Sequence, residues 1–175
     1  HPDTEVECLL NPGVFQFREM TWLVVRVAER PEQKEGEISF PIIKKGSVEI
    51  VSFRLDDPLL DISDPREPRY NGITYLSTLS HLRLFNSEDG VHFKDAGWPN
   101  LFGKGDLESY GIEDCRVASM KDGSYLLTYT ATSENGYGVG LRRTCDWKTH
   151  EEFGMILPPA NKDCAIFEKK IKGEY

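Results

Sequence analysis

One pattern occurs three times along the chain and constrains its fold more than any other feature. Each copy has a polar residue, a short apolar stretch, a turn and a second stretch led by an aromatic residue. The copies begin at Asn11, Asp114 and Asp163. Trp22 and Tyr125 lead the second stretches of the first two copies, and they are separated by the same interval as Asn11 and Asp114. A repeat of β units at this period is the sequence signature of a β-propeller.

The stretches within the copies have the composition of β-strands. Trp22–Ala28 and Tyr125–Ala131 align residue by residue and are rich in β-branched and aromatic residues. Residues 84–93 and 141–150 share the pattern Leu-x-x-Ser/Thr-x-Asp, whose hydroxyl and carboxylate suit a turn cap at a strand end. Helical periodicity is not sustained anywhere, and the nearest segment is short, at Asp106–Tyr110. We therefore expect an all-β propeller, of which this chain covers roughly the first three blades.

Residues 31–70 interrupt the repeat. This segment is charged and rich in proline, and it has one strand-like core, Val48–Phe53. We interpret it as an insertion inside the first blade, which explains why the first interval of the repeat is about twice the second. Long insertions usually carry function or contacts to other subunits, so we expect a homo-oligomer contact here.

The third copy reaches Tyr175 in the middle of its hairpin. Because three units do not close a ring, a chain of this kind leaves open edge strands. We therefore expect residues 1–175 to be part of a single propeller domain that has further blades.

Composition limits the classes of partner that we expect and indicates a cellular location. The chain has 29 Asp and Glu residues against 21 Lys and Arg residues and a net charge of -8, whereas binding to nucleic acid needs a basic footprint. It has no apolar run long enough to span a bilayer and no visible signal peptide. The four cysteines lack the spacing of a zinc site, and Cys115 and Cys164 share one repeat position. We expect reduced thiols, no metal, no nucleic-acid or membrane partner and a cytoplasmic protein.

Charged residues cluster around Asp114, with Glu113 before it and Arg116 shortly after. In a propeller the first strand of each blade lines the central channel, so Asn11, Asp114 and Asp163 should converge near the axis. On a regular strand Asp114 and Arg116 share one face and Glu113 points the other way. Charges beside a core are costly unless they serve each other or a ligand. A catalytic carboxylate and a structural Asp–Arg pair both explain the cluster.

Several motifs together form the signature of a known family. Gly-Ile-Glu-Asp-Cys-Arg at 111–116, followed by Tyr-Thr-Ala at 129–131, resembles the Gly-Val-Glu-Asp-Pro-Arg and Tyr-Thr-Ala elements of glycoside hydrolase family 130. Asn11 with its following proline, together with Arg26, looks like the family's early Asn-Pro and Tyr-Arg elements. Residues 84–93 resemble its blade-closing motif, and Pro158–Phe167 resembles its Asn-Lys-Asp-x-x-Leu-Phe segment.

The resemblance implies a five-bladed β-propeller that cleaves β-mannosides with inversion. Most members are phosphorylases that release α-mannose 1-phosphate, and some are β-1,2-mannosidases. The resemblance implies that Asp114 is the catalytic acid, that Asn11 and Arg26 bind sugar, and that Arg116 orients the carboxylates. It implies no cofactor, with inorganic phosphate as co-substrate in a phosphorylase. Cys115 stands where the family usually has proline, so the restriction that proline places on φ is absent there.

The remaining candidates follow from the chemistry of inverting cleavage. Such cleavage needs an acid on the leaving oxygen and a nucleophile on the opposite face, and a phosphate nucleophile needs cationic donors. Lys162, beside Asp163, is our first candidate for binding phosphate, and Arg143 is another, with a solvated blade edge as its alternative role. His81 either meets the substrate or forms an ordinary hydrogen-bonded strand pair. Four aromatic residues could stack on sugar rings, namely Trp22, Trp98, Tyr110 and Tyr137. We expect Trp22 in the core from its repeat position, and Trp98 and Tyr110, which lie in loops before the Asp114 strand, are the better candidates.

The full set of expected substrate-binding residues is Asn11, Arg26, His81, Glu113, Arg116 and Asp163. We expect the partner to be an oligosaccharide substrate and the activity to be that of a glycoside phosphorylase or glycosidase. A sugar-binding propeller without catalytic activity is the alternative from a different functional class.

Overall fold

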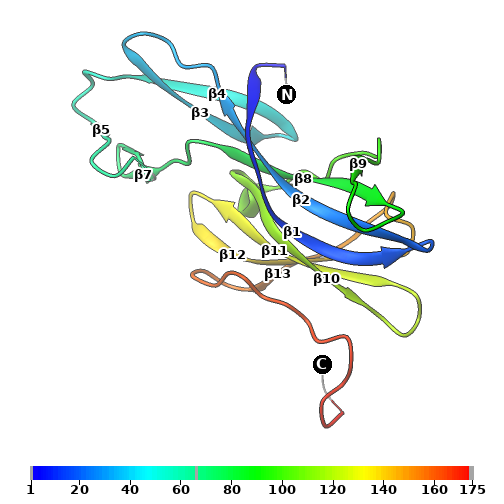
Figure 1. The fold of residues 1–175 in the computed structure, drawn as a ribbon. Helices are drawn as coiled ribbons and strands as arrows, with labels where there is room; N and C mark the ends of the chain where they lie inside the picture. The colour runs from blue at the N-terminus through cyan, green and yellow to red at the C-terminus, as the bar shows by residue number, and fades with distance from the viewer. Residues whose placement is uncertain (1, 66, 174–175) are drawn as a thin grey trace.

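The computed structural model describes residues 2–65 and 67–173, and most of them form β-strands (Figure 1). One eight-stranded sheet has the order β1-β2-β8-β10-β11-β12-β13, and β9 pairs with β8. Its strands are β1 (Thr4–Phe17), β2 (Met20–Pro31), β8 (Leu79–Ser87), β9 (Lys94–Asp95), β10 (Gly111–Ser119), β11 (Tyr125–Ser133), β12 (Gly136–Thr144) and β13 (Glu151–Leu157). The expectation of an all-β protein is confirmed.

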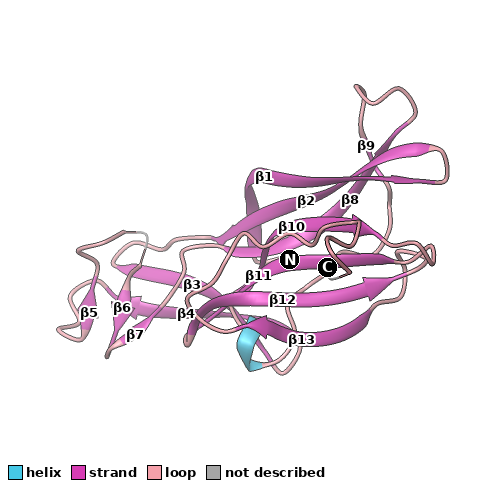
Figure 2. Ribbon diagram, turned by 90° about the horizontal axis from the view of Figure 1, so that it is seen from below, coloured by secondary structure: helices cyan, strands magenta, loops and turns pink. Residues whose placement is uncertain are grey.

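The sheet consists of two antiparallel halves that meet at one point. The first half contains β1, β2, β8 and β9, and the second half contains β10, β11, β12 and β13 (Figure 2). A single parallel pair, between Gly111 of β10 and Ser80 of β8, joins them. Gly111 has a φ of 103°, and a Cβ added to it would lie 2.2 Å from the carbonyl oxygen of Ser80. This seam therefore brings the two halves together more closely than a residue with a side chain allows.

The first two copies of the repeat fold alike. Trp22 lies near the start of β2 and Tyr125 begins β11, so the aligned stretches are equivalent strands. The predicted turn caps are confirmed as well, because Asp89 accepts the backbone N–H of His92 at 2.8 Å and Asp146 accepts that of Thr149 at 2.8 Å.

The third copy differs from the first two. No strand follows β13 in the described part of the chain, and Asp163–Phe167 runs as an irregular segment. It lies against the second half, where Thr128 Oγ1 donates to the carbonyl of Cys164 at 2.6 Å. A strand needs a partner for its backbone N–H and C=O groups, and the partner expected to begin at Tyr175 lies outside the described residues.

Residues 32–78 lie between β2 and β8, which are themselves paired along their length. The segment forms a hairpin of β3 (Glu37–Lys44) and β4 (Ser47–Arg54) and a small sheet of β5 (Leu60–Asp61), β6 (Arg69–Tyr70) and β7 (Ile73–Thr74). It projects from one end of the large sheet in both ribbon views (Figures 1 and 2). The sequence-based prediction gave this segment the bounds 31–70; from here on we use the name insertion for residues 32–78, between β2 and β8.

Aromatic side chains fill the core of the large sheet. Phe15 of β1 stacks on Trp147 with ring centroids 3.8 Å apart, and this contact joins the two halves. Trp22 is also in this core, as its repeat position suggested. Trp98, another residue considered for stacking on sugar, packs on Trp22 at 4.8 Å and therefore serves the core.

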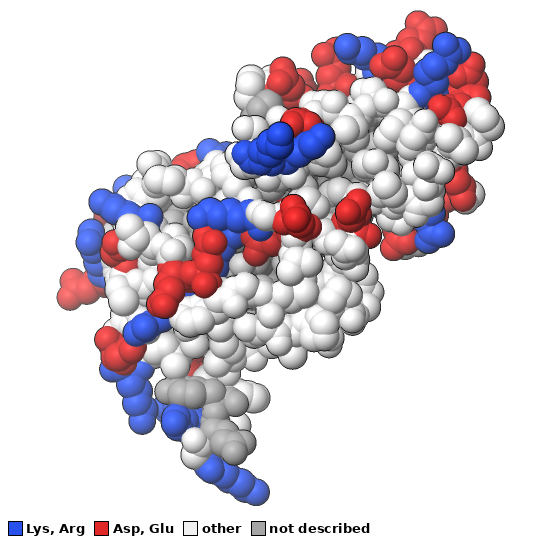
Figure 3. Space-filling model, turned by 180° about the vertical axis from the view of Figure 1, so that it is seen from behind, with Lys and Arg blue, Asp and Glu red and all other residues white. Residues whose placement is uncertain are grey.

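The surface has no strong bias in charge on the face that Figure 3 shows, where acidic and basic side chains are interspersed. The helical structure in the described residues is the short 3-10 turn η1 (Asp106–Glu108), and it has neither the length nor the apolar character to cross a membrane.

Candidate active site

The site forms where β1 and β10 approach each other. Asn11 Nδ2 donates to Asp114 Oδ1 at 3.0 Å, and the side chain of Asp114 is only 6% exposed. The two strands approach closely because Gly13 has no side chain, since a Cβ there would lie 2.5 Å from the carbonyl oxygen of Cys115. The predicted convergence of Asn11 and Asp114 is therefore seen.

One arginine holds both neighbouring carboxylates. Arg26 Nη1 donates to Asp114 Oδ1 at 3.3 Å, and its Nη2 donates to Glu113 Oε1 at 2.8 Å. Its Nε donates to Ser80 Oγ at 2.9 Å, and Ser80 Oγ in turn donates to Glu113 Oε1 at 3.1 Å. Asn11, Arg26, Ser80, Glu113 and Asp114 thus form one hydrogen-bonded group, which we call the carboxylate cluster.

The prediction that Glu113 faces away from Asp114 is wrong. Asp114 has a φ of 51°, and a bulge interrupts the pairing between Glu113 and Arg116. Two residues of β10 stand opposite one residue of β11 at this bulge, so the alternation of side chains breaks down there. The bulge is what allows both carboxylates to reach Arg26.

Arg116 has a different role from the one expected. Its Nη1 donates to the main-chain carbonyls of Cys115 at 3.0 Å, Asn11 at 3.3 Å and Asp114 at 3.4 Å. These bonds tie β1 to β10 at the bulge, so Arg116 orients the backbone beneath the carboxylates, while Arg26 orients the carboxylates themselves.

The electrostatics of the cluster favour uptake of a proton. Burial raises the pKa of Glu113 above its ordinary value, and the charge of Asp114 acts in the same direction. Arg26 opposes this increase but does not cancel it. Two carboxylates that share one guanidinium leave a net negative charge in a largely buried place, which a proton from solution would neutralise.

An open groove of about 610 Å³ leads to the cluster. It is lined by Arg26, Arg30, Pro65, Leu76, Ser77, Thr78, Glu113, Thr130, Thr132, Tyr137 and Lys162. Lys162, the first candidate for binding phosphate, is one of these lining residues. Asp163 is exposed and pairs with Lys162 at 3.6 Å, so it belongs to the rim and not to the cluster.

Two predicted residues lie elsewhere. His81 follows Ser80 on β8 and points to the opposite face, where its Nε2 is 2.9 Å from Glu29 Oε1 in a buried pair. Arg143 lies at the far end of β12 and donates to Asp122 at 2.8 Å. The structure does not bring either residue to the groove, and in each case the alternative role considered from the sequence accounts for the contacts observed.

Sequence reasoning missed Ser80 and Thr130. Ser80 has no exposed surface and bonds to two charged residues of the cluster. Side chains alternate along a strand, so Ser80 and His81 point to opposite faces. Because the prediction took His81 as the residue that faces the site, it left out Ser80. Thr130 pairs with Glu113 between β11 and β10. This pairing depends on the register of the strands at the bulge, so it could not be predicted from the sequence.

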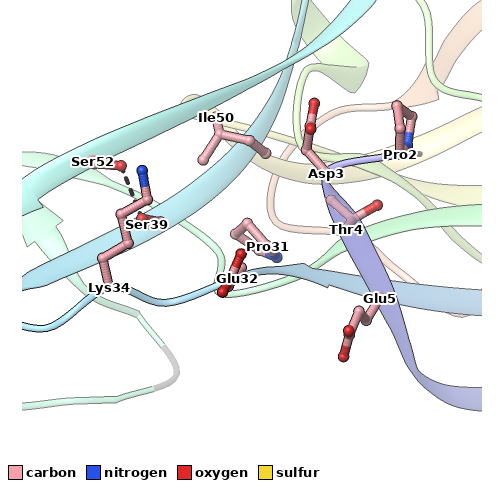
Figure 4. Close-up of a pocket in the computed structure, with 10 residues that line it drawn as sticks. All are labelled: Pro2, Asp3, Thr4, Glu5, Pro31, Glu32, Lys34, Ser39, Ile50 and Ser52. Atoms are coloured by element: carbon pink, nitrogen blue, oxygen red, sulfur yellow. Dashed lines mark hydrogen bonds between the residues drawn. The ribbon is translucent and has the colours of Figure 1, made fainter.

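Another hollow lies between the start of β1 and the β3–β4 hairpin (Figure 4). Its volume is about 520 Å³, and none of the predicted site residues line it. On the hairpin side the hydroxyls of Ser39 and Ser52 form a hydrogen bond with each other, with their Oγ atoms 2.8 Å apart. Among the described residues, no group of three or more His, Cys, Asp or Glu side chains could hold a metal ion.

Comparison with known proteins places these features in a family. The family model for β-1,4-mannooligosaccharide phosphorylases, glycoside hydrolase family 130, matches residues 69–175. Over its whole length the chain is 37% identical to the β-1,2-mannobiose phosphorylase of Listeria innocua, of which it covers 51%. It is 27% identical to a β-1,2-mannobiose phosphorylase of a Thermoanaerobacter species, over 85% of this chain and 48% of the relative. The chain therefore spans about half the length of these curated relatives.

Solved structures agree with the sequence comparison. The Listeria innocua enzyme in complex with β-1,2-mannobiose superposes with a TM-score of 0.89 and 35% identity, over 99% of this chain and 51% of that one. A glycosyl hydrolase from Bacteroides ovatus superposes with a TM-score of 0.55 at 18% identity, over 84% of this chain and 31% of that one, which shows a shared fold. The chain belongs to glycoside hydrolase family 130.

Proposed function

We propose that the protein containing this chain cleaves β-mannosides by phosphorolysis with inversion and releases α-mannose 1-phosphate. The observation that carries the proposal is the carboxylate cluster, in which Asn11 and Arg26 hold Asp114. Arg26 and Glu113 of this cluster line the open groove. The names of the Listeria and Thermoanaerobacter relatives support β-1,2-mannobiose as the substrate, although the description of the family model names the β-1,4 linkage.

In the proposed reaction Asp114 is the acid. Its proton passes through a sugar hydroxyl to the glycosidic oxygen as the bond from that oxygen to the anomeric carbon breaks. A phosphate oxygen forms the new bond to the anomeric carbon from the opposite face, which inverts its configuration. Asn11, Arg26 and Glu113 bind the hydroxyls of the mannosyl ring, and Arg116 holds the bulge that presents Asp114.

The phosphate needs a cation at the groove, and Lys162 is the residue that we propose for it. We do not include Arg143, because its guanidinium is paired with Asp122 away from the groove. Asp163 sets the position of Lys162 through their ion pair, and His81 supports the strand from its other face.

We also propose that the complete fold is a five-bladed propeller in which β1 and β10 are inner strands. The two four-stranded halves support this, because four antiparallel strands make up one blade. A cytoplasmic location is supported by the four free cysteines. We propose further that the insertion contacts a second subunit.

The test is an assay of the full-length protein on β-1,2-mannobiose with and without phosphate. We expect mannose 1-phosphate to form only with phosphate, and Asp114→Asn to lower kcat about 10²–10⁴-fold, the usual contribution of a general acid. Asp56→Asn, an exposed carboxylate in the insertion, is the matched control and should leave kcat unchanged. Equal turnover without phosphate would indicate hydrolysis, and binding of mannobiose without turnover would indicate a sugar-binding protein.

A further inference from the structure

The β3–β4 hairpin has two outer edges, and the edge of β3 is closed although no strand pairs with it. Every second residue of β3 points its backbone N–H away from β4. These donors and their acceptors are Glu37 with the carbonyl of Lys34 at 3.1 Å, Ser39 with Gln33 Oε1 at 2.9 Å, and Ile43 with the carbonyl of Ser109 at 2.7 Å. Pro41, the remaining residue of this set, has no N–H, and proline is a common protection of a sheet edge.

The outer edge of β4, in contrast, is open. The same four residues of β3 pair with Arg54, Ser52, Ile50 and Val48 of β4. Because the β3 donors of these pairs point away from β4, the pairs lack hydrogen bonds between the two strands, and their β4 members point outward as well. Among the described residues, the N–H groups of these four β4 residues have no hydrogen-bond partner. Such an edge is a template for a further strand.

The charges around β4 differ between its two ends. The turn before it holds Lys44 and Lys45, and the segment after it holds Asp56 and Asp57. The side chains of Lys44 and Asp56 are 61% and 70% exposed. Antiparallel pairing of two such strands places the basic end of each beside the acidic end of the other, whereas parallel pairing places like charges together. The strand is therefore complementary in charge to an antiparallel copy of itself.

We propose that β4 pairs with β4 of a second copy of this chain, antiparallel about a twofold axis, so that the two hairpins form one four-stranded sheet. Outward-facing residues must stand opposite each other. The register that uses all four of them places Val48 opposite the partner's Arg54 and Ile50 opposite the partner's Ser52. Val51 then meets its own counterpart on the axis. This gives a surface to the subunit contact proposed for the insertion.

Apolar surface near the edge favours the same pairing. Ile50 and Val51 are half-buried in the single copy, and Leu55, directly after β4, is 49% exposed. The second copy covers part of each side chain, and burial of apolar area drives association. The backbone hydrogen bonds fix the register, as in other cases in which a strand is added to a sheet edge. The hairpin projects from one end of the large sheet, which leaves it accessible to a second copy (Figure 1).

The first experiment tests the register by cross-linking the full-length protein. Val51→Cys places two thiols opposite each other in a pair without backbone hydrogen bonds, where the Cα atoms lie about 4.5 Å apart and a disulfide can form. Mild oxidation should give a covalent dimer joined through position 51 in peptide mapping. Glu49→Cys is the matched control, because Glu49 stands opposite the partner's Phe53, and it should not cross-link. No cross-link in Val51→Cys, or equal cross-linking in both variants, would overturn the pairing.

The second experiment measures the dimer dissociation constant of the full-length protein by analytical ultracentrifugation. Ser52→Pro removes an outward N–H from each copy and should raise Kd at least about tenfold. Ser52→Ala is its control, because both variants lose the hydroxyl bond to Ser39 but only the proline loses the N–H, and it should keep the wild-type Kd. A monomeric wild type, or an equal Kd in all three proteins, would overturn the pairing.

Neither measurement involves turnover, so the outcomes separate this inference from the proposed function. A dimer that assembles through β4 without phosphorolysis would overturn the proposed function alone. A monomer that carries out phosphorolysis would overturn the β4 pairing alone, since another part of the protein or another partner would then cover the edge.

Discussion

Asp114 and Glu113 illustrate how one arginine can serve two carboxylates. Arg26 uses Nη1 for the first, Nη2 for the second and Nε for Ser80, so three of its donors have partners. Such a planar fork is fixed in geometry, and lysine could not replace it. The cluster is therefore preorganised before a substrate enters, at the cost of placing two acidic groups side by side.

The raised pKa of Glu113 makes the stability of the fold depend on pH. Between the ordinary pKa of a glutamate and the raised pKa of Glu113, the folded protein keeps a proton that the unfolded chain has released. The contribution of Glu113 to the free energy of unfolding should therefore fall as the pH rises through this interval. Urea unfolding over a pH series should show the stability of the wild type falling relative to Glu113→Gln.

Glu88→Gln, an exposed glutamate in the turn after β8, is the control for this prediction. It should shift the stability by the same amount at every pH. Parallel curves for the wild type and Glu113→Gln would contradict a raised pKa for Glu113.

The repeat predicted that Asn11 and Asp114 approach each other, but not how the side chains around them are arranged. Asn11, Asp114 and Asp163 all have a left-handed backbone, with φ of 42°, 51° and 56°. Short polar side chains tolerate this conformation, so the residue type at the repeat position is partly a requirement of the backbone. The same conformation breaks the alternation of side chains along β10. For this reason the sequence-based prediction placed Glu113 on the wrong face, and it assigned to Arg116 the contact with the carboxylates that Arg26 makes.

Among the elements, the seam between β8 and β10 is the most constrained place. The two strands pair through a single pair of residues, Gly111 and Ser80. Ser80 lies so close to Gly111 that there is no room for a Cβ at position 111. Ser80 also belongs to the carboxylate cluster, so the position of the seam determines the position of the Arg26–Glu113 pair.

Gly111→Ala should therefore destabilise the protein more than an alanine at another glycine of positive φ. Gly123 is the matched control, because its φ is 82° and a Cβ there meets no atom within 4 Å. Urea unfolding should give a loss of about 1–2 kcal/mol for Gly123→Ala from the left-handed backbone alone. Gly111→Ala should lose at least about 2 kcal/mol more, because a buried clash adds to that cost. Equal losses of unfolding free energy in the two variants would mean that the backbone at the seam shifts to accommodate the Cβ at little cost.

The strands β2 and β11 of the large sheet followed from composition, but β3 did not. It contains Pro41, which removes a backbone donor and usually argues against a strand. The strand forms because β3 and β4 make a two-stranded sheet, in which each strand has a free edge. Local sequence could not predict this, since the number of neighbours of a strand is a property of the whole fold.

At the scale of the whole molecule, aromatic contacts join the insertion to the large sheet. Phe53 stacks on Tyr70 at 3.8 Å within the insertion, and Phe40 stacks on Tyr75 at 5.2 Å. Tyr75 in turn lies 6.0 Å from Tyr110, which directly precedes β10. Composition set this segment apart in the sequence, but its place beside the groove depends on these long-range contacts and could not be predicted.

Tyr75 is the link in this chain of contacts, so Tyr75→Ala should loosen the insertion without unfolding the sheet. Hydrogen exchange should become at least about tenfold faster in β3 and β4, the effect of roughly 1.4 kcal/mol of lost local stability, and should not change in β11 and β12. Binding of β-1,2-mannobiose should weaken as well, because Leu76–Thr78 follows Tyr75 directly and lines the groove.

Phe153→Ala provides the control, since it removes an exposed ring of the large sheet. Unchanged exchange in β3 and β4 would show that Tyr75 does not anchor the insertion. Faster exchange with unchanged mannobiose binding would show an insertion that is anchored by Tyr75 but does not shape the groove.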